Sequence, residues 1–274
     1  MRTTDSPAYV FEDRAEEHRR LIDQSVLFDP LTARLLQAAG IAPGMRVLDL
    51  GTGAGSVALL AARMVGPSGA VVTVDRDTDA LALAAAHAER EGVRNVEFVE
   101  GDLGIPELPG GSFDAVVSRL LLMYLPDPAA TLHAAALQLR PGGVLCCHEM
   151  SMSPHAAMPE PPLVARVHHA IATTFRLAGA ELHLGLQLHR LMADAGLPAP
   201  ELHGETLLAC GPEAPMWAWA NVARGLLPLM ERLGVAGADE VRAADLEERM
   251  LAELCAHDAV LVAPMLVGAW TRVP

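Results

Sequence analysis

Over the first 150 residues, short runs of consecutive apolar residues alternate with segments in which apolar residues recur at helical spacing. Five apolar runs predict strands, at 45–50, 71–74, 96–99, 113–117 and 144–147. Four periodic segments predict helices, at 9–39, 56–64, 81–91 and 129–139. Strands that alternate with helices at this spacing indicate βαβ units and a mostly parallel sheet. Their continuous apolar character is typical of strands that are covered on both faces.

The pattern changes after residue 150. Residues 151–162 contain four prolines and predict a loop. Three later segments predict helices, at 163–177, 186–195 and 216–233. Two more strands are expected, at 201–209 and at 260–273, the second in two pieces around Pro264 and Gly268. The second half of the chain therefore adds mainly helices to the alternating first half.

A glycine-rich turn separates the first predicted strand from the helix that follows it. Gly51, Gly53 and Gly55 stand at alternate positions after an apolar run that contains Asp49. Glycines allow a sharp turn and a close approach of the backbone to a ligand, and the N-terminus of the next helix offers free N–H groups. The dinucleotide fingerprint GxGxxG would end at position 56, which is Ser56, so the pattern disfavours a nicotinamide cofactor.

Acidic residues follow the next two predicted strands. Asp75 comes directly after the strand at 71–74, where a carboxylate can accept hydrogen bonds from both hydroxyls of a ribose. Asp102 follows the strand at 96–99, where it can accept from the amino group of an adenine; capping a turn is its other interpretation. Because parallel strands end at one edge of the sheet, the three strand ends together predict one nucleoside-binding site.

Composition narrows the chemistry. The chain has 274 residues, 51% of them hydrophobic, which is enough for a large core. Its net charge is −14, without a basic run, which disfavours a nucleic acid partner. All 20 basic residues are arginine, which excludes reactions that require a lysine. The adjacent Cys146 and Cys147 are expected to point to opposite faces of the sheet as packing residues.

These strand ends resemble those of the class I S-adenosylmethionine-dependent methyltransferases, most closely over residues 46–149. Two further landmarks match, Phe113 to Ser118 in the fourth strand and Leu139 to Gly143 before the fifth. The segment Leu125 to Pro128 is similar to small-molecule enzymes of the ubiquinone and menaquinone biosynthesis type. The resemblance implies an α/β fold: a Rossmann-like, seven-stranded, mostly parallel sheet with helices on both faces and an added helical cap.

The resemblance also implies a domain organisation and a cofactor. Residues 1–274 would form a single methyltransferase domain, with an N-terminal helical lid at 1–44 and a cofactor-binding core at 45–150. Residues 151–274 would supply the substrate-side helices and the last strands. The cofactor would be S-adenosylmethionine, and no metal site is expected.

The family's roles carry over residue by residue. Asp49 would order the glycine turn and, through water, the methionine part of the cofactor, and Asp75 would hold the ribose. Arg119 would line the methionine end together with Ser118, although a surface ion pair is its other interpretation. Gln24 would reach the methionine carboxylate or simply fill an exposed helix position. The implied cofactor-binding residues are Gln24, Asp49, Gly51, Thr52, Gly53, Asp75, Arg76, Asp102, Leu103, Ser118 and Arg119.

A general base would help if the acceptor is a hydroxyl group, whereas an acceptor that is already nucleophilic needs none. The candidates are His148 and Glu149 at the end of the fifth predicted strand, and His155 in the following loop. His168 and His169 lie on a predicted helix from which one of them can face a pocket. Each of these histidines has a packing or surface role as its alternative. The histidine that many relatives carry after the fourth strand is missing, because residues 120–125 read LLLMYL.

The predicted acceptor pocket is apolar. It would be roofed by the N-terminal helix, the loop at 151–162 and the helices between 163 and 256. Apolar residues occupy more than one helical face around residue 220, and packing on the sheet or on a partner subunit is their alternative role. They are Met216, Trp217, Trp219, Leu226, Leu229 and Met230.

The predicted function is transfer of a methyl group from S-adenosylmethionine to a small, mainly hydrophobic organic acceptor. One alternative is an enzyme of this fold that uses the bound cofactor for a non-methylating reaction such as a cyclisation. A silent binding subunit is disfavoured, because Gly51, Gly53 and Asp75 are present. The expected partner is a small molecule, with neither nucleic acid nor membrane, and a homodimer is left open. A polar N-terminal segment and the lack of a long apolar run predict a cytoplasmic location.

Overall fold

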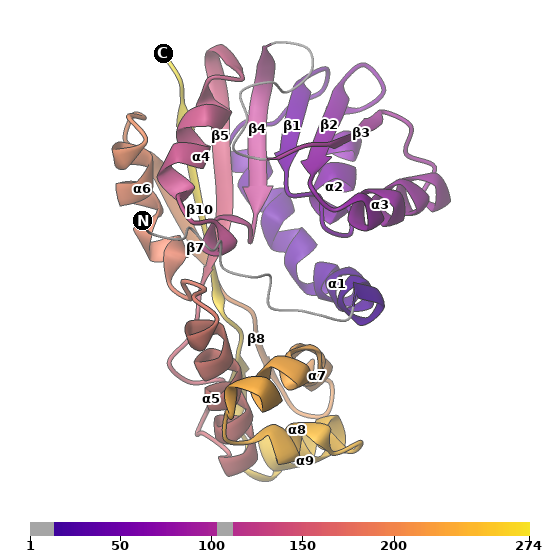
Figure 1. Ribbon diagram of the computed structural model, residues 1–274, viewed down its shortest axis with the longest axis vertical. Coiled ribbons are helices and arrows are strands. Elements are labelled where there is room, and N and C mark those ends of the chain that lie inside the picture. The colour runs from indigo at the N-terminus through magenta and orange to yellow at the C-terminus, as the bar shows by residue number, and fades with distance from the viewer. Residues whose placement is uncertain (1–13, 103–111) are drawn as a thin grey trace.

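The computed structural model describes residues 14–102 and 112–274 (Figure 1). Seven strands of the described chain form one sheet in the order β3-β2-β1-β4-β5-β10-β7. They are β1 (Arg46–Leu50), β2 (Ala70–Asp75), β3 (Val96–Glu100), β4 (Phe113–Arg119), β5 (Leu139–Ser151), β7 (Glu201–Glu205) and β10 (Met265–Arg272). The first five run parallel, and β10 is antiparallel to β5 and β7. The predicted seven-stranded, mostly parallel sheet is confirmed.

Helices cover both faces of this sheet, as predicted. They include α1 (Arg14–Ala38), α2 (Ser56–Val65), α3 (Thr78–Arg90), α4 (Pro128–Ala136) and α6 (Leu188–Asp194). The apolar sides of α1 and α2 pack on one face in a cluster with Val47 and Cys146. On the other face α4 and α6 pack in a cluster with Leu48 and Cys147. The expected division of the two cysteines between opposite faces is therefore confirmed.

A helical cap lies beyond the carboxyl ends of β1, β2 and β4, below the sheet in Figure 1. It contains α5 (Pro162–Leu177), α7 (Met216–Leu233), α8 (Ala238–Arg242) and α9 (Leu246–Ala256). Two 3-10 turns lie in the connections between these elements: η1 (Leu122–Tyr124) between β4 and α4, and η2 (Leu184–Gln187) between α5 and α6. The buried apolar residues of α5, α7 and α9 join the cluster on the α4 face of the sheet, so the cap shares a continuous core with it.

The last strands differ from their expected form, because a second, three-stranded sheet divides them. It consists of β6 (Ala157–Met158), β9 (Val260–Val262) and β8 (Leu208–Cys210). The expected strand at 201–209 is therefore two strands, β7 in the main sheet and β8 in the small one. The break at Pro264 is confirmed, whereas Gly268 lies inside β10, where its missing side chain lets Leu35 of α1 pack closely. The expected loop at 151–162 contains β6.

Two boundaries also differ from the prediction. The helix expected at 129–139 ends at Ala136, because the next residues pair with the start of β4: Phe113 donates its N–H to the carbonyl of Gln138. The helix expected at 9–39 is observed from Arg14 onwards, and residues 9–13 lie outside the described part. Within the described residues, no helix is both long and apolar enough to span a membrane. The division of one domain into lid, core and substrate-side part stays a prediction.

Candidate functional site

The candidate site lies where the order of the strands reverses. Strand β1 sits between β2 and β4, so the connections that leave β1 and β4 go to opposite sides of the sheet. In open α/β sheets this point leaves a crevice at the carboxyl ends of the strands, where ligands bind. The glycine turn follows β1 at this point.

The three glycines of the turn all have a left-handed backbone, with φ of 76° at Gly51, 49° at Gly53 and 83° at Gly55. A Cβ at Gly51 would lie 2.8 Å from Cδ1 of Leu121, and one at Gly55 would lie 2.9 Å from Cβ of Ala84. The left-handed backbone favours glycine at both positions, and at Gly55 the neighbouring atoms of Ala84 also exclude a side chain. A Cβ at Gly53 would only reach an ordinary contact, 3.5 Å from a side-chain carbon of α1. Protein atoms alone therefore do not exclude a side chain at Gly53.

Asp75 ties the glycine turn to the end of β2. Its Oδ2 accepts a hydrogen bond from the N–H of Gly53 at 3.3 Å, and its Oδ1 accepts one from the N–H of Asp77 at 3.0 Å. The carboxylate is half-buried and stands at the predicted crevice. Arg76 and Asp102 are exposed at the ends of the neighbouring strands β2 and β3. Leu103 lies outside the described residues.

Asp49 is fully buried beneath the turn. The hydroxyl of Thr73 donates to its Oδ2 at 2.8 Å, whereas its Oδ1 has no hydrogen-bond partner. Burial raises the pKa of this carboxyl to about 7, although the Thr73 hydrogen bond and the charge of Arg119 act in the opposite direction. The buried hydroxyl of Thr52 also lacks a partner. Unpaired buried polar atoms are uncommon, so both positions indicate a place for water or a ligand.

The turn that follows β4 closes over the glycines and is held by Glu149. Leu120 has a left-handed backbone with φ of 51°, which is unusual for a leucine. Oε1 of Glu149 accepts hydrogen bonds from the N–H groups of Leu121 at 2.9 Å and Leu122 at 2.8 Å. Burial raises the pKa of Glu149 to about 7, although these hydrogen bonds act to lower it. Glu149 therefore fixes the turn that places Leu121 over Gly51.

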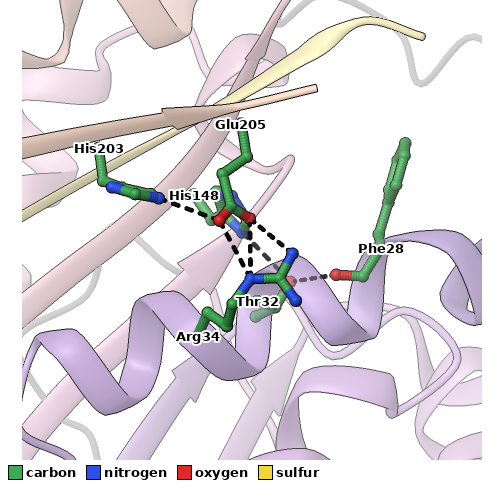
Figure 2. Close-up of polar contacts among 6 residues, drawn as sticks. All are labelled: Phe28, Thr32, Arg34, His148, His203 and Glu205. Atoms are coloured by element: carbon green, nitrogen blue, oxygen red, sulfur yellow. Dashed lines mark hydrogen bonds and ion pairs between the residues drawn. The ribbon is translucent and has the colours of Figure 1, made fainter. Parts of the chain in front are cut away.

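The side chain of His148 points to the face of the sheet opposite to that of Glu149, where it contacts α1 (Figure 2). Its Nδ1 lies 3.1 Å from Oγ1 of Thr32, and that hydroxyl donates to the carbonyl of Phe28 at 3.0 Å. Because the hydroxyl hydrogen goes to Phe28, Nδ1 of His148 donates to Thr32. Burial, together with the nearby charge of Arg119, lowers the pKa of His148 to about 3. The imidazole is therefore neutral and anchors α1.

Arg119 and Arg34 hold the same helix by ion pairs. Arg119 donates to Thr32 at 3.0 Å and to the carboxylate of Asp29 at 2.8 Å, in a mostly buried position. Arg34 pairs at 2.9 Å with Glu205 of β7 in a more exposed position. Figure 2 shows Glu205 between Arg34 and His203. Helix α1 is thus tied to three strands, and Arg119 makes an ion pair that is mostly buried and not at the surface.

An apolar cavity opens beside this site, enclosed by α1, the turn after β4, α5 and α7. It is lined by Arg20, Leu21, Gln24, Leu27, Phe28, Leu120, Met123, Tyr124, Met150, Met152, Ile171, Phe175, Leu207, Pro215, Trp217, Ala218, Trp219, Asn221, Val222, Leu261, Ala263 and Pro264. Leu21 also provides the side-chain carbon that an added Cβ on Gly53 would meet, at 3.5 Å, so the cavity adjoins the glycine turn. Of the apolar residues expected here, Trp217 and Trp219 line the cavity. The other four are packed in the core, their alternative role: Met216, Leu226, Leu229 and Met230.

The histidines proposed as bases do not line this cavity. His155 is half-exposed and pairs with Glu160 at 3.1 Å. His168 is buried against Trp219, with ring centroids 5.3 Å apart, and the exposed His169 lies beside it on a separate pocket. A catalytic role for these residues, and for His148 and Glu149, stays a prediction. Within residues 14–102 and 112–274, no group of three or more His, Cys, Asp or Glu side chains is placed to hold a metal ion.

Several lining residues escaped the sequence prediction. On α1, positions 20, 21, 24, 27 and 28 recur at helical spacing, and this periodicity could have marked them as one face. Leu120, Met123 and Tyr124 stand in the segment noted only for its missing histidine. Asn221 had no local signal, because its position follows from the packing of α7 against the rest of the cap.

The sequence profile of a methyltransferase domain family matches residues 41–196, which include the glycine turn and the turn after β4. The chain belongs to the class I S-adenosylmethionine-dependent methyltransferases. Nocamycin O-methyltransferase of Saccharothrix syringae is 33% identical over 224 residues, which cover 74% of this chain and 78% of that protein. Arsenite methyltransferase of Aquipseudomonas alcaligenes is 43% identical over 117 residues, which cover 40% of this chain but only 34% of that protein.

A solved methyltransferase structure has the same fold. The S-adenosylmethionine-dependent methyltransferase of Aquifex aeolicus superposes with a TM-score of 0.53, at 22% identity, over 72% of this chain and 92% of that one. S-adenosylmethionine is the cofactor of the protein described here, as it is of its family. The crevice fits such a group in two respects: the space beside Gly53 is free of protein atoms that would exclude a ligand, and Asp49 and Thr52 offer unpaired polar atoms.

Proposed function

We propose that this methyltransferase transfers a methyl group to a small, mainly apolar organic molecule bound in the cavity between α1, α5 and α7. The observation that carries this proposal is the position of Leu21. Its side chain lines the cavity and lies 3.5 Å from the position that a Cβ on Gly53 would take, so an acceptor in the cavity would lie next to the cofactor turn. A concave, mostly apolar site with few polar groups is typical of small-molecule binding.

In this proposal the backbone of Gly51, Thr52 and Gly53 holds the cofactor, and Asp75 accepts hydrogen bonds from its ribose. The exposed Arg76 and Asp102 flank the adenine. The open Oδ1 of Asp49 binds the methionine part through water.

The methionine end of the cofactor would lie toward β4 and α1. Ser118 is buried at the end of β4, beside Cys147 in the register of the sheet, and would line this end. Gln24 accepts a hydrogen bond from Arg20 at 3.1 Å on the cavity wall, where it remains the candidate for the methionine carboxylate. Arg119 would act through its contacts to Asp29 and Thr32, which position α1.

When bound, the cofactor supplies an electrophilic methyl group. The protein's part is to align the acceptor with it and to exclude water, which α1 and the turn after β4 do by closing the cavity. We propose that His148 and Glu149 serve as positioning residues. Each uses a polar atom to hold an element of the cavity wall, His148 the helix α1 and Glu149 the turn at 120–122.

Oxygen is the proposed site of methylation. Support comes from nocamycin O-methyltransferase, which matches this chain over three quarters of its length. A small-molecule acceptor, rather than a nucleic acid, is supported by the apolar lining and by the net charge of −14.

Incubating the full chain with S-adenosylmethionine and a panel of small phenols and enols tests the function. We expect S-adenosylhomocysteine in the same amount as a product that has gained one methyl group by mass spectrometry. A converted acceptor with unchanged mass, without S-adenosylhomocysteine, would instead support the non-methylating alternative. Turnover of polar acceptors alone would contradict the apolar-acceptor proposal.

A further inference from the structure

Helix α7 has two faces of different character. One face is packed into the core, with Met216, Ala220, Ala223, Leu226 and Met230 fully buried. The other face is only half-buried and lines the cavity with Trp217, Ala218, Asn221 and Val222. Positions 217 and 221, and positions 218 and 222, are one helical turn apart, so the four side chains form one continuous strip. Asn221 is the polar member of an otherwise apolar strip.

The polar side chains of the cavity wall differ in how they are satisfied. Arg20 donates a hydrogen bond to Gln24. Tyr124 also interacts with another residue of the protein. The side chain of Asn221, by contrast, makes no hydrogen bond to any residue of the described chain. A carboxamide offers two donor hydrogens and one acceptor oxygen. Asn221 therefore presents three unused hydrogen-bonding positions to the cavity.

An amide in an apolar wall is costly when a ligand displaces its water without replacing the hydrogen bonds. A purely hydrocarbon acceptor would leave Asn221 in that state. An acceptor with a hydroxyl or carbonyl group would satisfy it, since the same amide can donate to a carbonyl or accept from a hydroxyl. A site built in this way discriminates against an analogue that lacks the polar group.

We propose that Asn221 is a specificity-determining residue that binds a neutral hydroxyl or carbonyl group on the acceptor. The substrate class is then an apolar, ring-sized molecule that carries a phenol, enol or ketone oxygen. This inference rests on the proposed function, because it takes the cavity to be the acceptor site. It goes further by assigning the polar recognition to one side chain of α7.

A pair of probes with the same shape tests this assignment. para-Cresol and para-xylene differ only in a hydroxyl group that replaces a methyl group. Calorimetric titration of the full chain, saturated with S-adenosylhomocysteine, measures the affinity for each. We expect para-cresol to bind roughly 3- to 10-fold more tightly, as one net hydrogen bond provides.

The variant Asn221→Leu should remove this preference while it keeps or improves the binding of para-xylene. Gln37→Leu is the matched control, because Gln37 is an exposed amide on α1 outside the cavity, and it should keep the preference. Thermal unfolding and S-adenosylhomocysteine affinity report whether each variant is folded. Asn221→Ser, which keeps a smaller hydrogen-bonding group, should retain part of the preference.

The outcomes separate the two proposals. If para-xylene binds and para-cresol shows no preference, the cavity is a ligand site but Asn221 does not determine its specificity. The same holds if Asn221→Leu weakens both probes equally, since that side chain then only packs. If S-adenosylhomocysteine binds but neither probe does, the proposed acceptor cavity fails, and the assignment of Asn221 fails with it.

Discussion

The cofactor turn and the acceptor cavity are built in opposite ways, although they share the side chain of Leu21. The turn comes from one stretch of sequence: Gly51, Gly53 and Asp75 lie within 25 residues, and the N–H of Gly53 donates a hydrogen bond to the carboxylate of Asp75. The cavity takes its walls from α1, the turn after β4, α5, α7 and the strands near the C-terminal end. Local geometry determines the first region, and tertiary packing determines the second.

This difference predicts how each region responds to mutation. A backbone site that approaches its ligand closely should lose binding through a single added carbon. A cavity whose wall includes Met123, Met150 and Met152 should adapt, because methionine side chains repack around irregular ligands. Changes in the turn should thus be severe and selective for the cofactor, whereas changes in the cavity wall should be graded.

The largest effect is expected for Gly53→Val. The substitution places a side chain in the space beside Gly53 that protein atoms leave free. We expect the affinity for S-adenosylhomocysteine, measured by calorimetry, to fall on the order of 1000-fold, which corresponds to about 4 kcal/mol. The affinity for para-xylene in the cavity should change little, which would sharpen the contrast between the two regions.

Gly92→Val is the matched control. Gly92 has a similar left-handed backbone, with φ of 68°, and nothing lies within 4 Å of an added Cβ. Both variants therefore carry the backbone strain of a β-branched residue at positive φ. Equal losses of cofactor affinity in the two variants would show that strain, and not the ligand, explains the result.

A change of stability with pH is expected for Glu149, which connects the two regions. Its pKa is raised by burial from an ordinary 4.5 to about 7, so the folded protein binds this proton more tightly than the unfolded chain does. As the pH rises from 4.5 through 7, ionised Glu149 therefore destabilises the fold, by up to about 3 kcal/mol. Glu149→Gln does not titrate and keeps an oxygen for the N–H groups of Leu121 and Leu122.

Urea unfolding of both proteins at pH 5 and pH 8 checks this prediction. The free energy of unfolding of the glutamine variant, relative to the original chain, should rise with pH. Asp49 also has a raised pKa and His148 a lowered one. Because both residues are present in the two proteins, their contributions cancel when the two free energies of unfolding are subtracted. A difference that is constant between the two pH values would contradict the raised pKa of Glu149.

The contrast also explains what the sequence could predict. The parallel order of the first strands, the glycine turn and the position of Asp75 follow from local patterns, and the structure bears out this geometry. Cys146 and Cys147 follow from strand alternation. The division of residues 201–209 between two sheets does not follow from such a pattern, because no proline or turn motif in this segment marks the bend. The bend depends on pairing with β9 and β10, which lie more than 50 residues away in the chain.

The roles of the polar residues near the site were harder to predict. A histidine and a glutamate at the end of a strand are typical candidates for a general base, and sequence does not reveal their partners. In the structure His148 donates to Thr32 on α1 and Glu149 accepts from a backbone turn. Both contacts join segments that are far apart in sequence, which no local spacing encodes. Asn221 was missed for the same reason.

A moderate effect is expected for Asp75→Ala. The substitution removes the proposed ribose contact and the hydrogen bonds to the N–H groups of Gly53 and Asp77. The affinity for S-adenosylhomocysteine should fall by about 2 kcal/mol, or roughly 30-fold. Asp75→Asn retains one acceptor oxygen and should lose less. Glu97→Ala, an exposed carboxylate on β3, is the control, and an equal loss in it would contradict the assignment.

The smallest effect is expected for Arg34→Ala, on the solvent-exposed side of helix α1. Arg34 pairs with Glu205, but its side chain is 54% exposed, and ion pairs in water contribute little to stability because solvent and salt screen them. The buried contacts of Thr32 with His148 and Arg119 hold α1 independently of this pair. We therefore expect the midpoint of thermal unfolding to fall by no more than about 2 °C, and less at high salt. Affinity for para-xylene should stay the same. If Arg34→Ala instead weakened para-xylene binding tenfold while leaving S-adenosylhomocysteine binding intact, the position of α1 over the cavity would depend on its surface pair, and the cavity would be an adjustable region in contrast to the fixed glycine turn.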